Sequence, residues 1–206
     1  MNPKVLPREA WAVVRKLEPF HAEGAWILAG GTGLALQLGH RVSLDLDFFS
    51  EAAFDGDLLR SHLGRLGSLE IQAQDTDTLH TRFDAIRLSY LRTEAPFLFP
   101  TIDYRGLRVA DARDIAAMKI IAIGGGGSRK DFVDLHAYLL AGGDFPGLLE
   151  IVRRRYVTTA FNEVHLLRSL VFFEDAEKEP MPRMLRSTTW NDVKSRLEEE
   201  ARRWAP

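Results

Sequence analysis

The sequence of 206 residues contains no cysteine. This absence excludes a disulfide framework, a thiolate zinc site and a cysteine nucleophile. The sequence also lacks an uncharged run near the roughly 20 residues that a membrane span needs, and no long apolar stretch follows its first residues. The net charge is only −2, so the global balance does not indicate a nucleic-acid-binding protein. These absences predict a cytoplasmic protein with no membrane partner.

The remaining composition, 46% hydrophobic and 27% charged, is typical of a soluble globular protein. Its apolar periodicity predicts helices at 7–23, 34–38 and 55–67 and strands at 25–29, 41–49, 69–74, 81–91 and 107–109. From residue 111 the pattern is almost wholly helical, with helices at 111–123 and 128–140 and two or three more within 144–206. We therefore predict an α+β protein with a mixed α/β part, residues 1–110, and a helical part, residues 111–206.

A glycine pair follows the first expected strand, in Gly30-Gly31-Thr32. Two glycines between a strand and a helix let the backbone approach an anion closely, and the helix N-terminus favours negative charge. Thr32 offers a hydroxyl donor or a helix cap. Taken alone, the motif is more often a simple turn with a cap; as a functional element it predicts a phosphate-binding loop.

Two aspartates, Asp45 and Asp47, lie on the next expected strand. Because side chains alternate along a strand, both project from one face, about 7 Å apart at the backbone. Two carboxylates at this spacing can reach one magnesium ion, although a solvent-facing edge strand explains them equally well. The order of strand, glycine turn, helix and strand places the glycines beside the aspartates, so the combination favours a phosphate and metal site.

Lys119 is the only charge in the apolar segment 115–123, a helix that we expect to be packed on most sides. Such a lysine either extends its ammonium to solvent or meets an anion. Downstream, Ser128 and Asp131 form a capping box at a helix start. Asp131 therefore has a structural explanation as good as a chemical one, and Asp134 is a weaker candidate.

Four segments together resemble the nucleotidyltransferase family of AbiEii-type toxins, within the DNA polymerase β superfamily. They are residues 26–49 with the Gly-Gly-Thr and Asp-x-Asp elements, residues 114–119, residues 129–135 and residues 172–177. They are spread over most of the chain and follow the family's order. The resemblance implies a minimal nucleotidyltransferase fold, a mixed β-sheet flanked by helices, with the helical C-terminal region completing the active site.

The resemblance also implies a reaction and its residues. The family transfers a nucleoside monophosphate from a nucleoside triphosphate to a hydroxyl, with Mg²⁺ or Mn²⁺; known acceptors are RNA, notably tRNA 3′ ends. A toxin of this kind acts in abortive infection and pairs with an antitoxin protein. The implied roles are metal binding and catalysis for Asp45 and Asp47, catalysis for Lys119 and Asp131, and nucleotide binding for the set Gly30, Gly31, Thr32, Lys119 and Arg129.

One position departs from the superfamily pattern, which places a third carboxylate on a neighbouring strand. Here Ser89 aligns with that position, and Asp84 lies on the opposite face by parity. The proton acceptor then comes from elsewhere, Asp131 included, or the protein is an inactive nucleotide-binding module. Nucleotide transfer to a protein hydroxyl is a further alternative.

A short basic run, Arg153-Arg154-Arg155, lies in the helical part. It could contact an RNA backbone, with Arg168 extending the patch, but a solvated helix face explains it better. No histidine has a metal-binding partner four residues away on a helix, so a zinc site is not expected.

Overall fold

The computed structural model describes residues 1–157 and 162–204 and contains one seven-stranded sheet. The strands are, in chain order, β1 (Ile27–Leu28), β2 (Asp45–Ser50), β3 (Leu69–Gln74), β4 (Thr78–Phe83), β5 (Ile86–Arg92), β6 (Ile102–Tyr104) and β7 (Leu107–Val109). They lie in the order β3-β4-β5-β2-β1-β7-β6. β2 pairs with β5 and β1 with β7 in parallel, whereas the other pairs are antiparallel, so the sheet is mixed as predicted.

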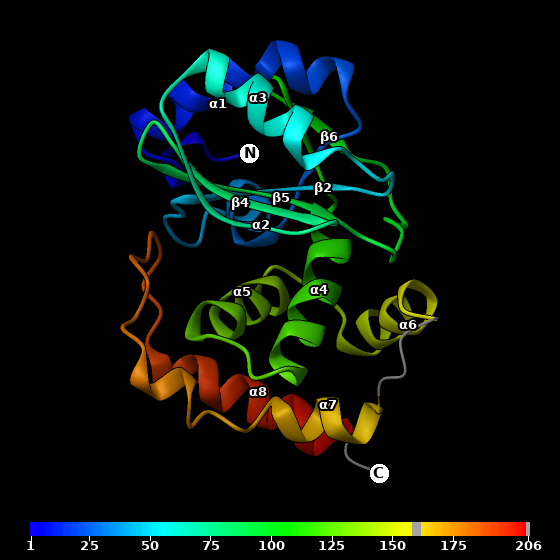
Figure 1. The fold of residues 1–206 in the computed structure, drawn as a ribbon. Coiled ribbons are helices and arrows are strands. Elements are labelled where there is room, and N and C mark those ends of the chain that lie inside the picture. Colours follow the sequence, from blue (N-terminus) through cyan, green and yellow to red (C-terminus); the bar gives the residue numbers. More distant parts are fainter. Residues whose placement is uncertain (158–161, 205–206) are drawn as a thin grey trace.

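Helices cover the sheet and form the second half of the chain (Figure 1). They are α1 (Arg8–Glu23), α2 (Gly30–Leu38), α3 (Gly56–Leu66), α4 (Ala112–Gly124), α5 (Arg129–Leu140), α6 (Phe145–Arg155), α7 (Glu163–Ser169) and α8 (Trp190–Trp204), with short 3-10 turns at Pro3–Val5 and Ala176–Lys178. In Figure 1, α1 and α3 lie on one face of the sheet, and α2, α4 and α5 lie on the other. The α+β prediction is confirmed.

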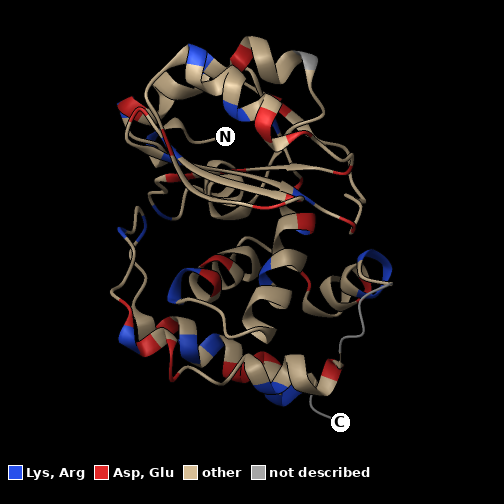
Figure 2. Cartoon of the chain, in the orientation of Figure 1, with Lys and Arg blue, Asp and Glu red and all other residues tan. Residues whose placement is uncertain are grey.

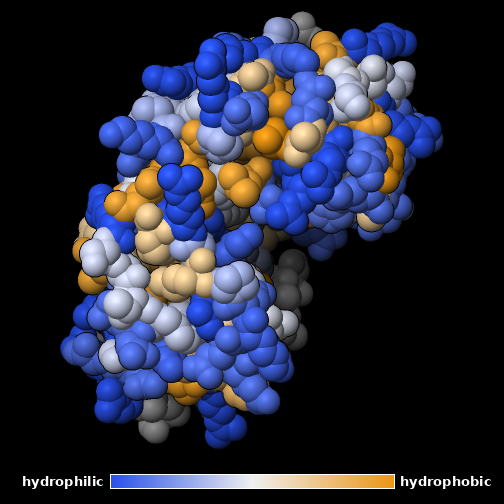
Figure 3. All heavy atoms as spheres, turned by 90° about the vertical axis from the view of Figure 1, so that its left-hand side faces the viewer, coloured by the Kyte–Doolittle hydropathy of each residue, from blue (hydrophilic) through white to orange (hydrophobic). Residues whose placement is uncertain are grey.

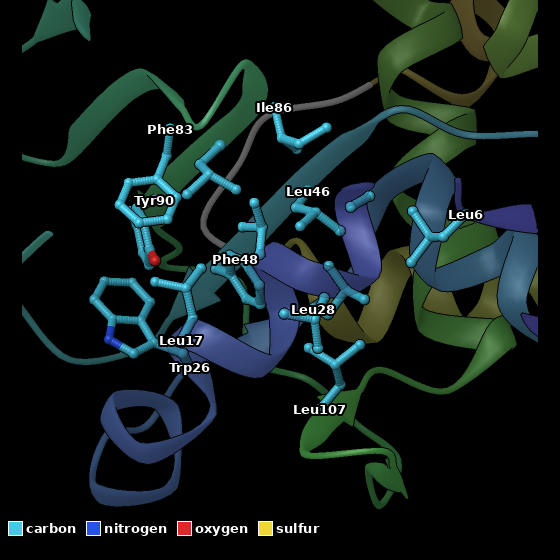
Figure 4. Packing of buried hydrophobic residues seen from close by; sticks show 14 of the residues in the cluster. Leu6, Leu17, Trp26, Leu28, Leu46, Phe48, Phe83, Ile86, Tyr90 and Leu107 are labelled. Carbon is cyan, nitrogen blue, oxygen red and sulfur yellow. The ribbon is translucent and has the colours of Figure 1, made fainter. Parts of the chain in front are cut away.

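The alternation of apolar residues along the strands builds the main core between the sheet and α1 and α3. Leu46 and Phe48 of β2 are buried there, together with Tyr90 of the neighbouring β5 and Phe83 of β4 (Figure 4). The ring of Phe48 stacks on that of Tyr90 at 5.4 Å between centroids. Because this face takes the apolar side chains, the alternate residues of β2 face the other side, where α4 and α5 lie.

The helical half has a core of its own. Side chains of α4 to α8 pack together around Ile120, Phe132 and Val152. A smaller third cluster, which includes Leu34 of α2 and Ile115 of α4, lies between the two halves. The two large cores fall on either side of residue 110, and the division into 1–110 and 111–206 stays a prediction.

The predicted strand at 81–91 is wrong, because the segment is a hairpin of β4 and β5. Its two-residue turn, Asp84-Ala85, has φ values of 45° and 68°. Such turns prefer Asn-Gly or Asp-Gly, and alanine gives no signal for one. Asp84 therefore lies in the turn, where it pairs with Lys16, and not near a strand's start. The short edge strand β6, Ile102–Tyr104, was also not predicted.

The basic run at the end of α6 is not a uniform solvated face. Arg155 is buried, and its guanidinium donates to the main-chain oxygen of Asp114 at 2.8 Å and lies 3.4 Å from its carboxylate. Arg153 is exposed and pairs with Glu163 and Glu150. Arg155 is thus a structural residue that joins α6 to the start of α4.

On the face seen in Figure 3, apolar side chains form separate patches over the sheet half among hydrophilic ones. The helical half is mostly hydrophilic on this face. Within the described ranges 1–157 and 162–204, no helix combines the length and the apolar character that crossing a membrane requires.

Candidate active site

A polar pocket of about 210 Å³ lies where the sheet meets α4 and α5. Figure 2 shows acidic and basic segments on α4 and α5 in this region. Five of the predicted site residues line the pocket, and four further residues join them: Gly31, Asp45, Asp47, Lys119 and Asp131, with Arg41, Ser43, Ser128 and Lys130. Residues from the segment 31–47 and from the distant segment 119–131 thus share one small space.

Asp45 and Asp47 project from the polar face of β2 into this pocket. The Oδ1 atom of Asp45 is buried and forms an ion pair with Arg87 Nε at 2.8 Å, and its Oδ2 atom lies 3.8 Å from Lys130 Nζ. Burial raises the pKa of Asp47, and Asp45 adds to this, against a hydrogen bond from Ser89 and the charge of Lys119. Two neighbouring carboxylates that repel each other in one pocket suit a bound cation.

The two glycines of α2 allow the helix start to lie against these charges. Gly30 has a φ of +57°, and a Cβ there would lie 2.7 Å from Asp47 Oδ2. A Cβ on Gly31 would lie 2.1 Å from the terminal Nη2 of Arg41. Only glycine fits at either position without displacing a charged group.

Thr32 takes a different place from the one predicted. The helix begins at Gly30 with Ala29 as its N-cap, so the prediction of Thr32 as the cap is wrong. Thr32 is buried, and its hydroxyl donates to the main-chain oxygen of Asp45. The side chain ties α2 to β2 and so holds the glycines beside the aspartates.

Lys119 meets anions inside the protein, and the alternative in which it reaches solvent is wrong. Its side chain is only 11% exposed, and Nζ lies 2.7 Å from Asp131 and 2.9 Å from Asp134. Burial alone would lower the pKa of Lys119, but these two carboxylates raise it. An ammonium has three N–H donors, so one remains for an oxygen of a bound anion in the pocket.

Asp131 combines the two roles that the sequence left open. One carboxylate oxygen accepts from the main-chain N–H and the hydroxyl of Ser128, both at 2.9 Å, which completes the capping box of α5. The other oxygen accepts from Lys119. Capping therefore fixes the carboxylate that holds the lysine.

Asp134 is fully buried and is the centre of the charge network behind the pocket. Arg41 donates to both of its oxygens, through Nε at 2.7 Å and Nη2 at 2.9 Å, and His40 Nε2 lies 2.8 Å away. Burial alone would raise the pKa of Asp134, but Lys119 and Arg41 lower it far below its usual range. Sequence reasoning did not single out Arg41, although its parity with Ser43 and Asp45 gave the signal.

Arg129, predicted to bind nucleotide, points away from the pocket. Its guanidinium donates to the carbonyls of Ala176 at 2.8 Å and Glu177 at 2.9 Å, and it lies 4.6 Å from the centroid of the Trp190 ring. Adjacent helical residues point about 100° apart, and Lys130 is the one that faces the pocket.

Ser89 lies where its alignment placed it. β2 and β5 are in register with Asp47 beside Ser89, so a hydroxyl occupies the position of the third carboxylate. On the far side of Ser89, His80 of β4 holds it through Nδ1···Oγ at 3.0 Å. Sequence reasoning missed His80, because the segment 81–91 was predicted as one strand and not as part of the hairpin that brings His80 to Ser89.

Comparisons with known proteins agree with this geometry. The model of the nucleotidyl transferase AbiEii toxin family, type IV toxin–antitoxin system, matches residues 11–205. The uncharacterized protein aq_aa25 of Aquifex aeolicus is 36% identical over 157 residues, which are 74% of this chain and 75% of that protein.

Two solved structures share the fold. One is a Helicobacter pylori protein assigned to the nucleotidyltransferases, with 18% identity, a TM-score of 0.56 and coverage of 98% of this chain and 95% of that one. The other is the nucleotidyltransferase toxin MenT4 of Mycobacterium tuberculosis, with 16% identity, a TM-score of 0.55 and coverage of 95% and 86%. Because the family model spans nearly the whole chain, the protein belongs to the AbiEii nucleotidyltransferase toxin family.

Proposed function

We propose that the protein transfers a nucleoside monophosphate from a nucleoside triphosphate to the 3′ end of a tRNA, as the toxin of a toxin–antitoxin pair that acts in abortive infection in the cytoplasm. The observation that carries the proposal is the pocket in which Asp45, Asp47 and Lys119 meet against Gly31. Family membership supports the class of reaction. The tRNA acceptor and the antitoxin partner come from the family resemblance alone.

The residues present fit a divalent cation. Asp45 and Asp47 offer adjacent hard oxygen ligands in one pocket, and the charge of Asp45 helps to raise the pKa of the buried Asp47. Among residues 1–157 and 162–204 no third acidic or histidine side chain completes a cluster. Mg²⁺ is commonly held by one or two carboxylates with substrate phosphates and water filling its other positions, and Mn²⁺ accepts similar ligands. When bound, the ion would neutralise charge on the triphosphate.

The chain's own residues supply the remaining requirements. The start of α2 offers main-chain N–H groups to phosphate, and the glycines allow that approach. The third N–H of Lys119 binds the triphosphate and offsets the charge that develops as pyrophosphate leaves. Asp131 and Asp134 fix the ammonium in place beforehand, so catalysis comes mainly from positioning and charge.

Labelling decides between acceptors. Full-length protein is incubated with each α-labelled nucleoside triphosphate, Mg²⁺ and either total tRNA or cell lysate, and the product is digested with ribonuclease or protease. We expect label on tRNA that is sensitive to ribonuclease and lost in Asp47→Asn. Asp103→Asn, on the exposed edge strand β6, is the matched control and should label normally.

Other outcomes have clear meanings. Protease-sensitive label that depends on Asp47 supports transfer to a protein hydroxyl. Calorimetric binding of a triphosphate with no labelling of any acceptor supports an inactive module. If Asp47→Asn labels tRNA as well as the unchanged protein does, the proposed site is wrong.

A further inference from the structure

Two arginines lie directly opposite each other on the polar face of the sheet, next to the pocket. Asp45 of β2 is the register partner of Arg87 on β5, and Arg87 is the partner of Arg82 on β4. Both arginines are exposed, whereas the residues beside them on their strands, such as Phe83 and Leu88, are buried in the core on the other face. The row therefore crosses three neighbouring strands on the side of the sheet that carries the pocket.

This row contains more positive charge than its neighbours compensate. Arg87 forms an ion pair with Asp45, from Nε to Oδ1 at 2.8 Å. Arg82 forms no ion pair with any described residue, although Glu70 of β3 is its register partner on the far side. Like charges directly opposite each other in an antiparallel pair destabilise a sheet. Two exposed guanidinium groups that share one carboxylate favour the binding of a further anion.

The strand order separates this row from the elements that hold phosphate. β2 has β1 on one side and β5 on the other. The glycines of α2 follow β1, and a Cβ on Gly30 would lie 2.7 Å from Asp47 Oδ2. In phosphoryl transfer the attacking and leaving oxygens lie in line, on opposite sides of the phosphorus. With the leaving phosphates held at the glycines, the acceptor hydroxyl therefore approaches from β5, where the arginines lie.

A divalent cation competes with Arg87 for the carboxylate of Asp45. The ion pair of Arg87 uses the same carboxylate that the cation would bind, and two positive charges at one carboxylate repel each other. The side chain of Arg87 is 55% exposed, so it can turn away from Asp45 without crossing the core. Cation binding thus frees a guanidinium on the side from which the acceptor arrives.

We propose that Arg87 and Arg82 bind the phosphodiester backbone of the acceptor RNA next to its 3′ end, and that Arg87 exchanges Asp45 for a phosphate when a divalent cation binds. This inference rests on the proposed transfer to RNA. A guanidinium matches phosphate oxygens in a bidentate geometry. Neighbouring strands are about 5 Å apart, so both groups reach phosphates close to the reacting end. Such contacts position the 3′ hydroxyl and carry no sequence information.

Binding of total tRNA to the full-length protein, with Mg²⁺ and without triphosphate, tests the contact apart from turnover. Fluorescence anisotropy at several salt concentrations gives the dissociation constant and its dependence on salt. We expect Arg82→Gln and Arg87→Gln each to weaken binding about tenfold, the usual effect of one lost charge-assisted hydrogen bond. Each should also lower the slope of log K against log salt by about 0.7, the value for one phosphate of a single strand.

Arg65→Gln is the matched control, because Arg65 is exposed on α3, on the other face of the sheet (Figure 1). It should change neither the affinity nor the slope. A slope that stays unchanged in both Arg82→Gln and Arg87→Gln overturns the proposal. Urea unfolding checks that the variants fold, and Arg82→Gln should lose no stability because it removes a repulsion.

Steady-state transfer from α-labelled triphosphate separates the acceptor from the nucleotide. We expect KM for tRNA to rise about tenfold in Arg82→Gln and in Arg87→Gln, with KM for the triphosphate unchanged in Arg82→Gln. A rise in KM for the triphosphate alone would assign the arginines to the nucleotide and overturn the proposal. Normal KM for tRNA, in a protein whose Asp47→Asn variant is inactive, also overturns it and leaves the proposed function standing. Absence of label on tRNA in the unchanged protein overturns both.

The exchange of partner by Arg87 has a readout that needs neither nucleotide nor RNA. Mn²⁺ alone is titrated into the full-length protein, and the free ion is measured by electron paramagnetic resonance. Arg87→Gln removes the competitor for Asp45 and should bind Mn²⁺ more tightly than the unchanged protein does. Arg82→Gln, one strand further from Asp45, should change this affinity less. Equal or weaker Mn²⁺ binding in Arg87→Gln overturns the exchange.

Discussion

At the scale of single residues, the absence of a side chain at Gly31 decides whether the pocket forms. We predict that Gly31→Ala destabilises the protein by about 1–3 kcal/mol, the usual cost of overpacking, because the new Cβ lies 2.1 Å from Arg41 Nη2. Arg41 is held by both oxygens of Asp134 and cannot move without breaking that pair. The rate of nucleotide transfer should fall together with the stability of the protein.

Gly64→Ala is the matched control for this change. Gly64 lies inside α3, with nothing within 4 Å of the position that an added methyl group would take. Alanine there should stabilise the protein by about 0.5–1 kcal/mol. Urea unfolding of both variants measures the difference, and an equal loss of stability in the two variants would rule out crowding at Arg41 as the cause.

The second prediction at the scale of residues concerns Asp131, which both caps α5 and pairs with Lys119. A control variant separates the effects of these two roles. Asp131→Ala should cost about 1 kcal/mol or more in unfolding free energy as a lost cap and should also abolish most transfer. Asp144 caps α6 through Gly147 N–H at 2.9 Å and lies outside the pocket. Asp144→Ala should cost a similar free energy and leave the transfer rate unchanged. Equal transfer rates for the two variants would show that Asp131 acts only as a helix cap.

Residue-level prediction from sequence succeeded where local geometry decides which residues meet. Strand parity placed Asp45 and Asp47 on one face, and the capping box set the place of Asp131. It failed at Arg129, whose direction depends on where α5 packs against the distant segment around Ala176. The places of Arg41 and His80 also depend on tertiary contacts. Arg41 pairs with Asp134, and His80 reaches Ser89 only through the hairpin of β4 and β5, which was not predicted.

At the scale of elements, α1 packs on the sheet through a histidine that cannot be charged. His21 is buried against Phe48, its Nε2 lies 3.1 Å from the Tyr90 hydroxyl, and its Nδ1 has no partner among the described residues. Burial lowers the pKa of His21 to about 3. Docking of α1 therefore requires the neutral ring.

The lowered pKa of His21 determines how its contribution to the free energy of unfolding changes with pH. Below an unfolded pKa of about 6.5 the unfolded chain binds a proton that the folded chain does not bind until about pH 3. Stability contributed by His21 is thus full above pH 6.5 and falls by about 1.4 kcal/mol per pH unit below it. Denaturant unfolding between pH 7 and pH 5 should show a flatter acid decline in His21→Gln than in the unchanged protein. Parallel curves would contradict the assignment.

The order of elements was largely predictable from the sequence, whereas their ends and the hairpins were not. Apolar periodicity located α1, α3, α4 and α5 to within a few residues. Both tight turns, at Asp84-Ala85 and Arg105-Gly106, have positive φ at both positions. Alanine and arginine disfavour this conformation, so the pairing of the flanking strands, and not the turn residues, determines these hairpins.

At the scale of the whole molecule, neither half contains a complete pocket. Asp45 and Asp47 lie on β2, whereas Lys119 and Asp131 come from α4 and α5. Arg41 from the first half is buried and depends on Asp134 from the second for its counter-charge. A buried charge that loses its partner costs about 3–5 kcal/mol, so each half stabilises the other.

We therefore predict one cooperative thermal transition for the full chain. Besides the ion pairs, the cluster around Leu34 and Ile115 would be exposed if either half unfolded alone. In calorimetry the transition enthalpy should equal its van 't Hoff value, as for a two-state domain. Asp134→Asn, which leaves Arg41 with a neutral partner, should lower the midpoint or split the transition, whereas Asp103→Asn should do neither. Two transitions in the unchanged chain would show that residues 1–110 and 111–206 are independent domains and that the shared charges do not couple them.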